Sequence, residues 1–252
     1  MKITRKDFLR IAACSVVAAG AKKLSHAIGG GDAPANPAKG NGRFGMVIDL
    51  QKCRKEKGCD KCARACHRTH NVPQIPDRAH EVKWIWSEPS ADVFPFQEYE
   101  YTRQTFPDTL PILCNHCTHP SCVRVCPTQA TWKREDGVVM MDYHRCIGCR
   151  YCMAACPYGS RSFNFVDPRP YLGQVNPDFP TRTAGVVEKC NFCEERLADG
   201  RLPACVEACP QNAMIFGNLD DENSPVRQIL RTRYSVQRHP ELGCGPSIFY
   251  LV

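Results

Sequence analysis

The alternation of apolar and polar positions predicts short strands rather than long periodic elements. The mostly apolar run 44–50 predicts one strand. The runs 130–134 and 138–142 flank the sequence Glu-Asp-Gly at 135–137, which is typical of a β-hairpin. A further strand is predicted at 213–217. The pattern therefore favours a fold assembled from small units with short strands.

Short apolar stretches at 153–155 and 206–208 suit single-turn helices, and each lies between two closely spaced cysteines. Strand, cysteine loop, short helix, turn and strand recur along the chain, which indicates an internal repeat. We expect an α+β fold made of such repeated modules.

Two long connections interrupt the repeat, at 67–113 and 163–187. The first holds one predicted strand, 82–86, on which Trp84 and Trp86 would share a face and serve core packing or a subunit contact. The second contains four prolines and predicts an extended loop.

Sixteen of the eighteen cysteines fall into four quartets, and each quartet ends in a Cys-x3-Cys step. The quartets are Cys53, Cys59, Cys62, Cys66; Cys114, Cys117, Cys122, Cys126; Cys146, Cys149, Cys152, Cys156; and Cys190, Cys193, Cys205, Cys209. Proline follows Cys126, Cys156 and Cys209. Cys-x2-Cys-x2-Cys-x3-Cys-Pro is the spacing of bacterial [4Fe-4S] ferredoxins. The sequence therefore predicts four [4Fe-4S] clusters held by these sixteen cysteines as iron ligands.

The quartets differ in how closely they follow that spacing. The third has no deviation, whereas the second and fourth widen the middle gap. The first is irregular, with five residues between Cys53 and Cys59 and with His67 where proline is usual. Its cluster, and above all its ligation by Cys53, departs most from the usual [4Fe-4S] pattern.

Other uses of cysteine fit these spacings poorly. Disulfides suit an exported protein, but repeated Cys-x2-Cys with a trailing Cys-x3-Cys is poor disulfide geometry. Zinc ribbons use paired Cys-x2-Cys knuckles, and only the fourth quartet resembles one. The histidines near the loops, His116, His119 and His144, are expected at the surface or behind the ligands. Cys244 belongs to no quartet and is expected to be a buried thiol.

The formal charge of +7 does not indicate nucleic-acid binding. Residues 1–27 carry six basic side chains and one acid, so they account for +5 and leave +2 for the remainder. Each cluster with four thiolates adds roughly −2, so four clusters would make the loaded protein acidic. No basic run interleaved with aromatics points to nucleic acid either.

Residues 1–27 resemble a twin-arginine export signal. The motif Thr4–Arg10 has Lys6 in place of the second arginine, and a weakly apolar stretch and a small-x-small site at 25–27 follow. Clusters are inserted in the reducing cytoplasm, so their carrier has to cross the membrane folded. We expect export by the twin-arginine route to the periplasmic or extracytoplasmic face of the cytoplasmic membrane, and a linker over 28–42.

The motifs CNHCTHPSCVRVCP, CIGCRYCMAACP and VVEKCNFCEERL, with a Gly-Cys-Gly-Pro tail, resemble the four-cluster ferredoxin subunits of bacterial membrane-bound oxidoreductases. The resemblance covers nearly all of residues 43–217. Within that family the chain looks most similar to the exported DsrO-type subunits of DsrMKJOP sulfur-metabolism complexes.

The resemblance implies two nested bacterial-ferredoxin-like modules with long loop insertions. The first quartet would exchange its last ligand with the fourth, and the second with the third. The implied ligand sets are Cys53, Cys59, Cys62, Cys209; Cys190, Cys193, Cys205, Cys66; Cys114, Cys117, Cys122, Cys156; and Cys146, Cys149, Cys152, Cys126. The implied organisation is an inner module at about 111–162, an outer module at 43–110 plus 163–217, and a C-terminal extension at 218–252.

The resemblance also implies a function and partners. The chain would be a non-catalytic subunit that relays electrons between an NrfD-type integral membrane subunit handling menaquinol and redox partners in sulfite or sulfur respiration, among them a multihaem cytochrome c. It would be membrane-associated through those partners and would bind no nucleic acid. The alternative is the equivalent subunit of a molybdopterin tetrathionate, thiosulfate or polysulfide reductase. A different kind of function would be that of a structural protein in which the metal only stabilises the fold and no electrons are transferred.

Overall fold

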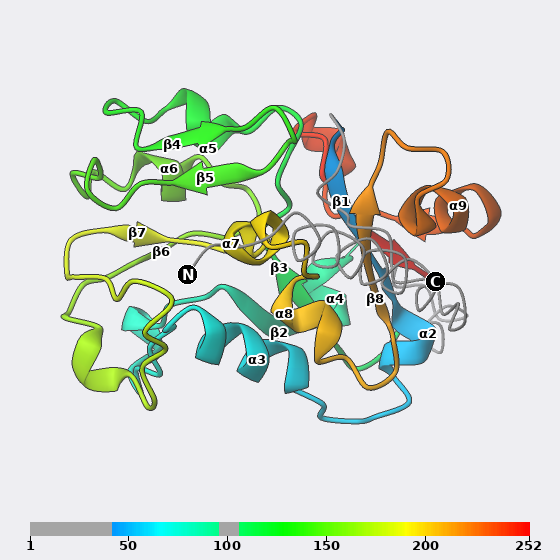
Figure 1. Cartoon of the computed structure of the whole chain (residues 1–252), viewed down its shortest axis with the longest axis horizontal. Helices are drawn as coiled ribbons and strands as arrows, with labels where there is room; N and C mark the ends of the chain where they lie inside the picture. Colours follow the sequence, from blue (N-terminus) through cyan, green and yellow to red (C-terminus); the bar gives the residue numbers. More distant parts are fainter. Residues whose placement is uncertain (1–41, 96–105) are drawn as a thin grey trace, which may run out of the picture. The chain divides into compact units, whose positions relative to one another are not determined.

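The structure is a computed structural model, and it describes residues 42–95 and 106–252 (Figure 1). The predicted export signal and nearly all of the predicted linker lie outside the described residues. The strands are β1 Phe44–Asp49, β2 Ile85–Pro89, β3 Thr109–Leu113, β4 Thr131–Lys133, β5 Val139–Met141, β6 Ser162–Phe163, β7 Val187–Glu188, β8 Met214–Asn218, β9 Ser235–Val236 and β10 Ile248–Leu251. The α-helices are α2 Leu50–Cys53, α3 Lys61–Thr69, α4 Ser90–Val93, α5 Ser121–Arg124, α6 Tyr151–Ala154, α7 Glu194–Ala198, α8 Ala204–Glu207 and α9 Pro225–Thr232, and three short 3-10 helices cover Arg78–His80, Arg169–Tyr171 and Pro240–Leu242.

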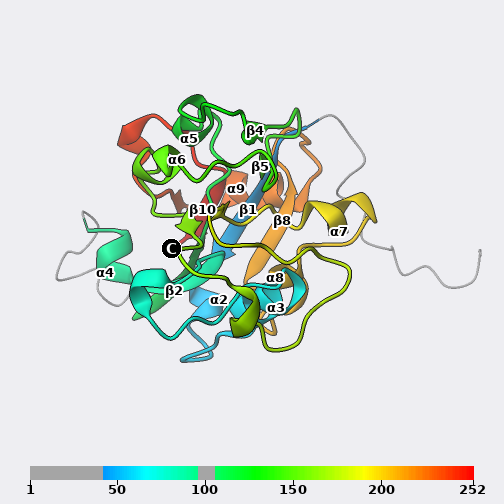
Figure 2. The ribbon, with the colours of Figure 1, turned by 90° about the vertical axis from the view of Figure 1, so that its left-hand side faces the viewer.

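A four-stranded sheet of order β8-β1-β10-β9 holds the core. Every residue of β1 is buried, as expected for a strand covered on both faces. Helix α9 packs against β8 and β1 (Figures 1 and 2), where Val226 joins Val47 and Leu251 in an apolar cluster on one face. The opposite face, with Met46 and Tyr250, belongs to the main core.

The predicted strand at 44–50 and the hairpin at 130–142 are confirmed. β4 and β5 pair antiparallel, with Thr131 opposite Met141. The expected strand at 213–217 is β8, which pairs antiparallel with β1. The residues from 218 onward, expected as a C-terminal extension, supply α9, β9 and β10 to this packing, and β10 runs parallel to β1.

The expectation for 82–86 was partly wrong. The strand is β2 and begins at Ile85, so Trp84 precedes it and does not share a strand face with Trp86. Trp84 is fully buried and its indole N–H donates to Glu188 at 2.9 Å, whereas Trp86 is half-buried and donates to Glu88. The buried carboxylate of Glu188 explains the difference, since an indole N–H inside a core needs an acceptor.

The short helices carry the cysteines, and their packing is nested. Helix α3 of the first quartet packs against α8 of the fourth, while α5 of the second packs against α6 of the third. In Figure 1, α5, α6 and the β4–β5 hairpin lie together at the top, and α3 and α8 lie at the bottom. In sequence order, the α5–α6 pair thus lies between the two helices of the α3–α8 pair.

The internal repeat is also visible in the backbone. Three residues after the cysteine of each Cys-Pro pair the backbone enters the left-handed region, at Gln129, Gly159 and Asn212. Left-handed turns at matching positions mark the same loop built three times, even where the residue is not glycine. Helices long and apolar enough to cross a membrane are absent from the part of the chain that the structure describes.

Candidate metal centre

The predicted ligand sets divide the sixteen quartet cysteines, which lie in short loops and at helix ends, into four groups. The outer terminal group is Cys53, Cys59, Cys62 and Cys209, and the outer medial group is Cys66, Cys190, Cys193 and Cys205. The inner medial group is Cys114, Cys117, Cys122 and Cys156, and the inner terminal group is Cys126, Cys146, Cys149 and Cys152.

The outer terminal group gathers where α2 ends, where α3 begins and where α8 has just ended. Burial, and after it the sulfurs of Cys209 and Cys59, raises the pKa of the Cys53 thiol to about 11. Burial and the sulfur of Cys53 raise the pKa of Cys62 to about 12, with smaller contributions from the other two. Cys209 therefore lies with the first quartet, although it closes the fourth.

The outer medial group takes its odd member from α3. Cys62 and Cys66 lie one helical turn apart on α3, yet Cys66 faces the other group. Burial raises the pKa of the Cys66 thiol, and three sulfurs of the fourth quartet raise it further: Cys193, Cys190 and Cys205. All four cysteines of this group are buried.

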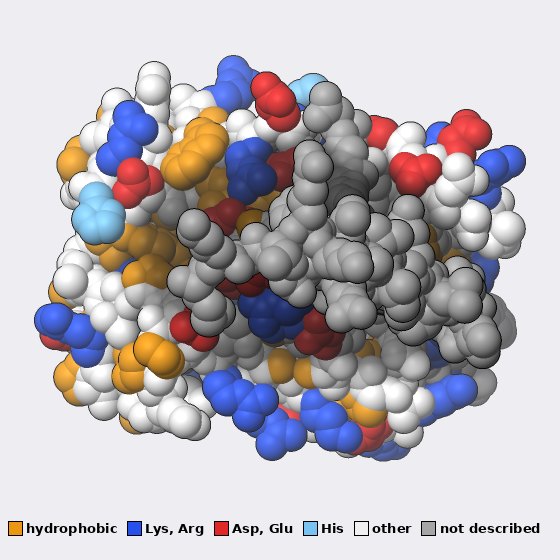
Figure 3. Space-filling model, viewed as in Figure 1, with side chains coloured by type: hydrophobic (Ala, Val, Ile, Leu, Met, Phe, Trp, Pro, Cys, Tyr) orange, Lys and Arg blue, Asp and Glu red, His pale blue; other side chains and the backbone are white. Residues whose placement is uncertain are grey.

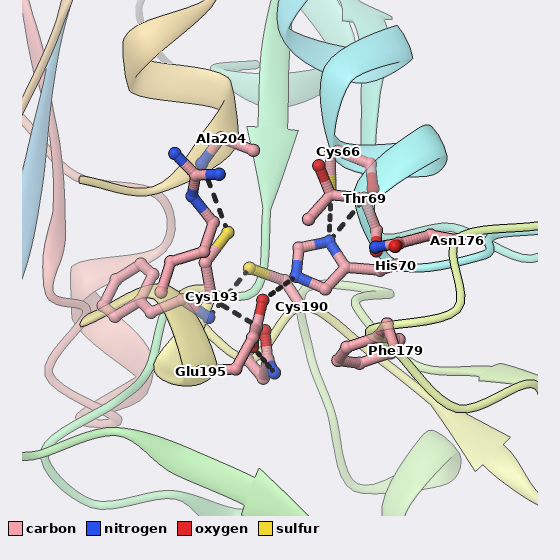
Figure 4. Close-up of polar contacts among 12 residues, drawn as sticks. Cys66, Thr69, His70, Asn176, Phe179, Cys190, Cys193, Glu195 and Ala204 are labelled. Atoms are coloured by element: carbon pink, nitrogen blue, oxygen red, sulfur yellow. Dashed lines mark hydrogen bonds and ion pairs between the residues drawn. The ribbon is translucent and has the colours of Figure 1, made fainter. Parts of the chain in front are cut away.

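His70 lies against the outer medial group (Figure 4). Its Nδ1 is 3.0 Å from the carbonyl oxygen of Cys66 and 3.6 Å from the Cys66 sulfur, and its Nε2 is 2.9 Å from a carboxylate oxygen of Glu195. The ring is buried and stacks on Trp84 with centroids 4.6 Å apart. His70 thus ties helix α3 to the loop that carries Cys193.

The inner medial group encloses a small cavity. All four of its cysteines line that cavity, together with Arg161 and Tyr158. Burial, and then Cys114, raises the pKa of the Cys117 and Cys156 thiols. Cys156 closes the third quartet but lies here with the second.

The inner terminal group is only partly brought together. Burial raises the pKa of Cys152, with contributions from Cys122 and from Cys146 of its own group. Cys149 is exposed, and the Cys126 sulfur lies 3.7 Å from the Thr128 hydroxyl. Although burial opposes it, hydrogen bonds from Thr131 and Thr128 hold the pKa of Cys126 below its usual value. The membership of Cys126 and Cys149 stays a prediction.

The groups form a row. Cys62 of the outer terminal group interacts electrostatically with Cys205 and Cys66 of the outer medial group. Cys190 interacts with Cys114 of the inner medial group, and Cys122 interacts with Cys152 of the inner terminal group. Each group thus has its sulfurs near those of the next group in the row.

Backbone amides point at several sulfurs. The N–H groups of Phe192, Ala204 and Ala213 donate to the sulfurs of Cys190, Cys193 and Cys209 at 3.4, 3.4 and 3.2 Å. Such bonds favour thiolate over thiol. A loop with inward amides therefore suits a ligand that arrives as a thiolate.

The donor sets fit [4Fe-4S] cubanes. Buried thiols that raise one another's pKa are neutral at pH 7 unless a cation compensates them, and iron bound to thiolate is such a cation. Four protein sulfurs around one site meet the cluster's need for one ligand per iron. Disulfides are absent among the cysteines in the described ranges.

Three buried side chains near the sulfurs, Arg161, Lys189 and His70, were not predicted, and a fourth, His116, was predicted as one of two alternatives. Arg161 and Lys189 are cations, and hydropathy expects arginine and lysine at the surface. His116 was expected at the surface or behind the ligands. It is fully buried, accepts from the Val139 N–H at 3.0 Å and stacks on Phe192 with centroids 3.7 Å apart. His70 showed no signal beyond lying four residues after Cys66.

The structure also places His144 and Cys244. His144 is exposed, as one of its two expected placements. Cys244 is buried, as expected, and contributes to the raised pKa of Cys117. The N–H groups of Thr118 and His119 donate to the carbonyl oxygens of Gly245 and Cys244, so this tail covers the second quartet's loop.

Comparisons with known proteins support [4Fe-4S] binding. The family described as a 4Fe-4S dicluster domain matches residues 105–167 and 175–219. The chain is 42% identical over 232 residues to the Hdr-like menaquinol oxidoreductase iron-sulfur subunit 1 of Archaeoglobus fulgidus, covering 82% of each chain. It is 38% identical to the menaquinone reductase iron-sulfur cluster-binding subunit of Nitratidesulfovibrio vulgaris, covering 83% of this chain and 88% of that one. It is 37% identical to a tetrathionate reductase subunit of Salmonella typhimurium, covering 86% and 77%.

Proposed function

Because the chain belongs to the family of 4Fe-4S iron–sulfur subunits of membrane-bound oxidoreductases, we propose that it relays electrons between a menaquinol-handling membrane subunit and a redox partner. Four [4Fe-4S] clusters, bound by the sixteen quartet cysteines, would form the wire. The proposal includes the nested exchange of last ligands between quartets.

The row of four sulfur groups carries this proposal. All four cysteines of the outer medial group are buried, the inner medial group has the buried Cys114 and three half-buried cysteines, and the exposed Cys149 belongs to the predicted inner terminal group. A wire needs this arrangement, since its ends exchange electrons with partners while its middle is shielded from solvent. A metal-stapled structural protein would not need ends that reach the surface.

The chain's own residues shape the transfer. When bound, the clusters supply one-electron oxidation and reduction at potentials set by hydrogen bonds, charge and burial. Ala204 and Ala213 donate backbone hydrogen bonds to ligand sulfurs, which makes those sulfurs less electron-rich. Apolar side chains such as Phe192 and Val139 keep water from the medial groups. With four thiolates at each cluster, iron has no free position for a substrate, so catalysis would belong to other subunits.

The complex we favour is a sulfite- or sulfur-metabolising one of the DsrMKJOP type. Two relatives whose names include menaquinol or menaquinone support a quinone-linked complex. Its membrane partner would be an NrfD-type subunit, and a multihaem cytochrome c would lie on the same side. The motif Thr4–Arg10 supports export to the periplasmic or extracytoplasmic side, and the N-terminal sequence of the mature protein tests it: a start near Ile28 is expected, and a start at Met1 would contradict export with cleavage.

A molybdopterin tetrathionate, thiosulfate or polysulfide reductase is the second candidate. The similarity to the tetrathionate reductase subunit of Salmonella typhimurium favours it. Purification of the native complex from membranes distinguishes the two, because a large molybdenum subunit would accompany the chain only in the second.

The relay itself is tested in the purified complex with a menaquinol analogue as donor. The expected result is electron paramagnetic resonance signals of reduced clusters that appear when the analogue is added and disappear when an oxidant is added. Clusters that stay oxidised with the analogue, although dithionite reduces them, would contradict a quinol-linked relay.

A further inference from the structure

Arg161 is a buried cation whose neighbours are sulfurs. The residue is 4% exposed. Its Nη2 donates to the Cys122 sulfur at 3.0 Å and to the Thr131 hydroxyl at 2.8 Å, and its Nη1 lies 3.8 Å from the Met141 sulfur. The guanidinium therefore donates one hydrogen bond directly to a predicted cluster ligand.

Arg161 has no carboxylate ion-pair partner within residues 42–95 and 106–252. By contrast, the equally buried Arg182 pairs with Glu188 at 2.6 Å. A buried unpaired charge is strongly destabilising, so a countercharge of another kind is expected. Thiolate-ligated clusters, at roughly −2 each, supply that countercharge.

Arg161 faces both inner groups at once. Its charge interacts with Cys122 and Cys114 of the inner medial group and with Cys152 of the inner terminal group. It opposes the rise in the pKa of Cys152 that burial causes, so it favours the thiolate there. A single guanidinium thus lies between two neighbouring clusters of the predicted row.

Buried and half-buried carboxylates lie beside the outer groups. Asp49 is 1% exposed and acts on Cys53, although Arg233 pairs with it at 2.6 Å. Glu195, hydrogen-bonded to His70, acts on Cys190 and Cys193. The buried cation Lys189 opposes Glu195 at Cys190 and also acts on Cys114 and Cys122 of the inner medial group. The inner half of the row therefore has the buried positive charge of Arg161, whereas these carboxylates lie in the outer half.

We propose that Arg161 raises the reduction potentials of both inner clusters together, so that the wire has a high-potential inner half and a low-potential outer half. The inference rests on the proposed function, since it requires the clusters. When an inner cluster accepts one electron from its outer neighbour, the neighbour is oxidised by one electron and no proton or bond moves. Arg161 is charged in both states, and its attraction is stronger for the reduced cluster, which carries one more negative charge.

The test is a redox titration of the purified complex, followed by electron paramagnetic resonance, with Arg161→Met. The expected result is a fall of at least about tenfold in the reduction equilibrium constants of two clusters, which is about 59 mV for one electron, with the other two unchanged. Arg161→Lys keeps the charge and should shift less. Arg134→Gln is the matched control, because it removes an exposed arginine that pairs with Asp136 and Glu194. All four reduction potentials should stay unchanged in this variant.

Unchanged potentials in Arg161→Met, or an equal shift of all four, would overturn the inference. If that variant does not assemble, Cys149→Ser and Cys53→Ser decide it in the otherwise native chain. Cys149→Ser should remove one of the two highest-potential signals and Cys53→Ser one of the two lowest, and the reverse would overturn it. Fewer than four clusters in the native protein would contradict the proposed function instead.

Discussion

At the scale of single residues, the cysteine spacing predicted the iron ligands and the family resemblance implied how they are shared, whereas most of the residues behind the sulfurs could not be predicted. Cys209 lies beside Cys53 and Cys62 as the family pattern implies. Arg161 and Lys189 gave no signal, because burial of a charged or polar side chain depends on partners from distant segments. Sequence spacing specifies ligands, and tertiary packing specifies what tunes them.

Cys53 tests the irregular first quartet. Cys53→Ser removes one thiolate from the outer terminal group, so that cluster should be lost or altered while the two inner clusters keep their signals. Electron paramagnetic resonance and iron content of the purified variant measure this.

Cys244→Ser is the matched control, because it makes the same chemical change at a buried cysteine outside the quartets. It should retain all clusters. Loss of an inner signal in Cys53→Ser, with the outer signals intact, would refute the assignment of Cys53.

At the scale of elements, local patterns predicted β1, the β4–β5 hairpin and the single-turn helices well. The pairing of β10 with β1 was not predicted, since it joins Ile248 to Met46 across most of the chain and leaves no local trace. The start of β2 was also misplaced, because Trp84 serves the core through a hydrogen bond rather than through strand alternation. Contacts between residues far apart in the sequence determine this strand pairing and the start of β2, and hydrophobic periodicity and turn residues do not reveal them.

Gly45 tests that long-range pairing. A Cβ at this position would lie 2.6 Å from the Leu219 Cδ1 and 2.8 Å from the Ser247 carbonyl oxygen, which is backbone and cannot move aside. Gly45→Ala should therefore lower the stability of the loaded protein by about 1–3 kcal/mol, measured as a lower unfolding temperature.

Gly173→Ala is the control, because no atom lies within 4 Å of a Cβ there. Its unfolding temperature should stay close to that of the native chain. An equal effect of both substitutions would argue against the close packing of β1 between β8 and β10.

At the scale of the whole molecule, ligand bonds and one modest sheet hold the described residues together. The helices that carry cysteines are mostly a single turn long, and such helices are not stable by themselves. Figure 3 shows basic side chains gathered along the lower edge of one face, where Figure 1 draws α3, and Lys61 and Arg64 there are solvent-exposed and paired with nearby acids. This basic edge is a solvated helix face whose charges are paired with acids.

Removal of iron should largely unfold the chain. Each cluster links segments far apart in sequence, so its bonds form only in the folded state and contribute to folding. Chelation under reducing conditions should abolish most of the secondary structure seen by circular dichroism. An unchanged spectrum would show that the protein core is sufficient without metal.

The central claim is a wire of four clusters in one chain. Coulometric reduction of the purified protein, with iron and sulfide measured on the same sample, tests it most directly. We predict roughly 16 iron atoms and about four electrons taken up per chain, one for each [4Fe-4S] cluster. Zinc in place of iron, or an uptake of two electrons or fewer, would contradict the account.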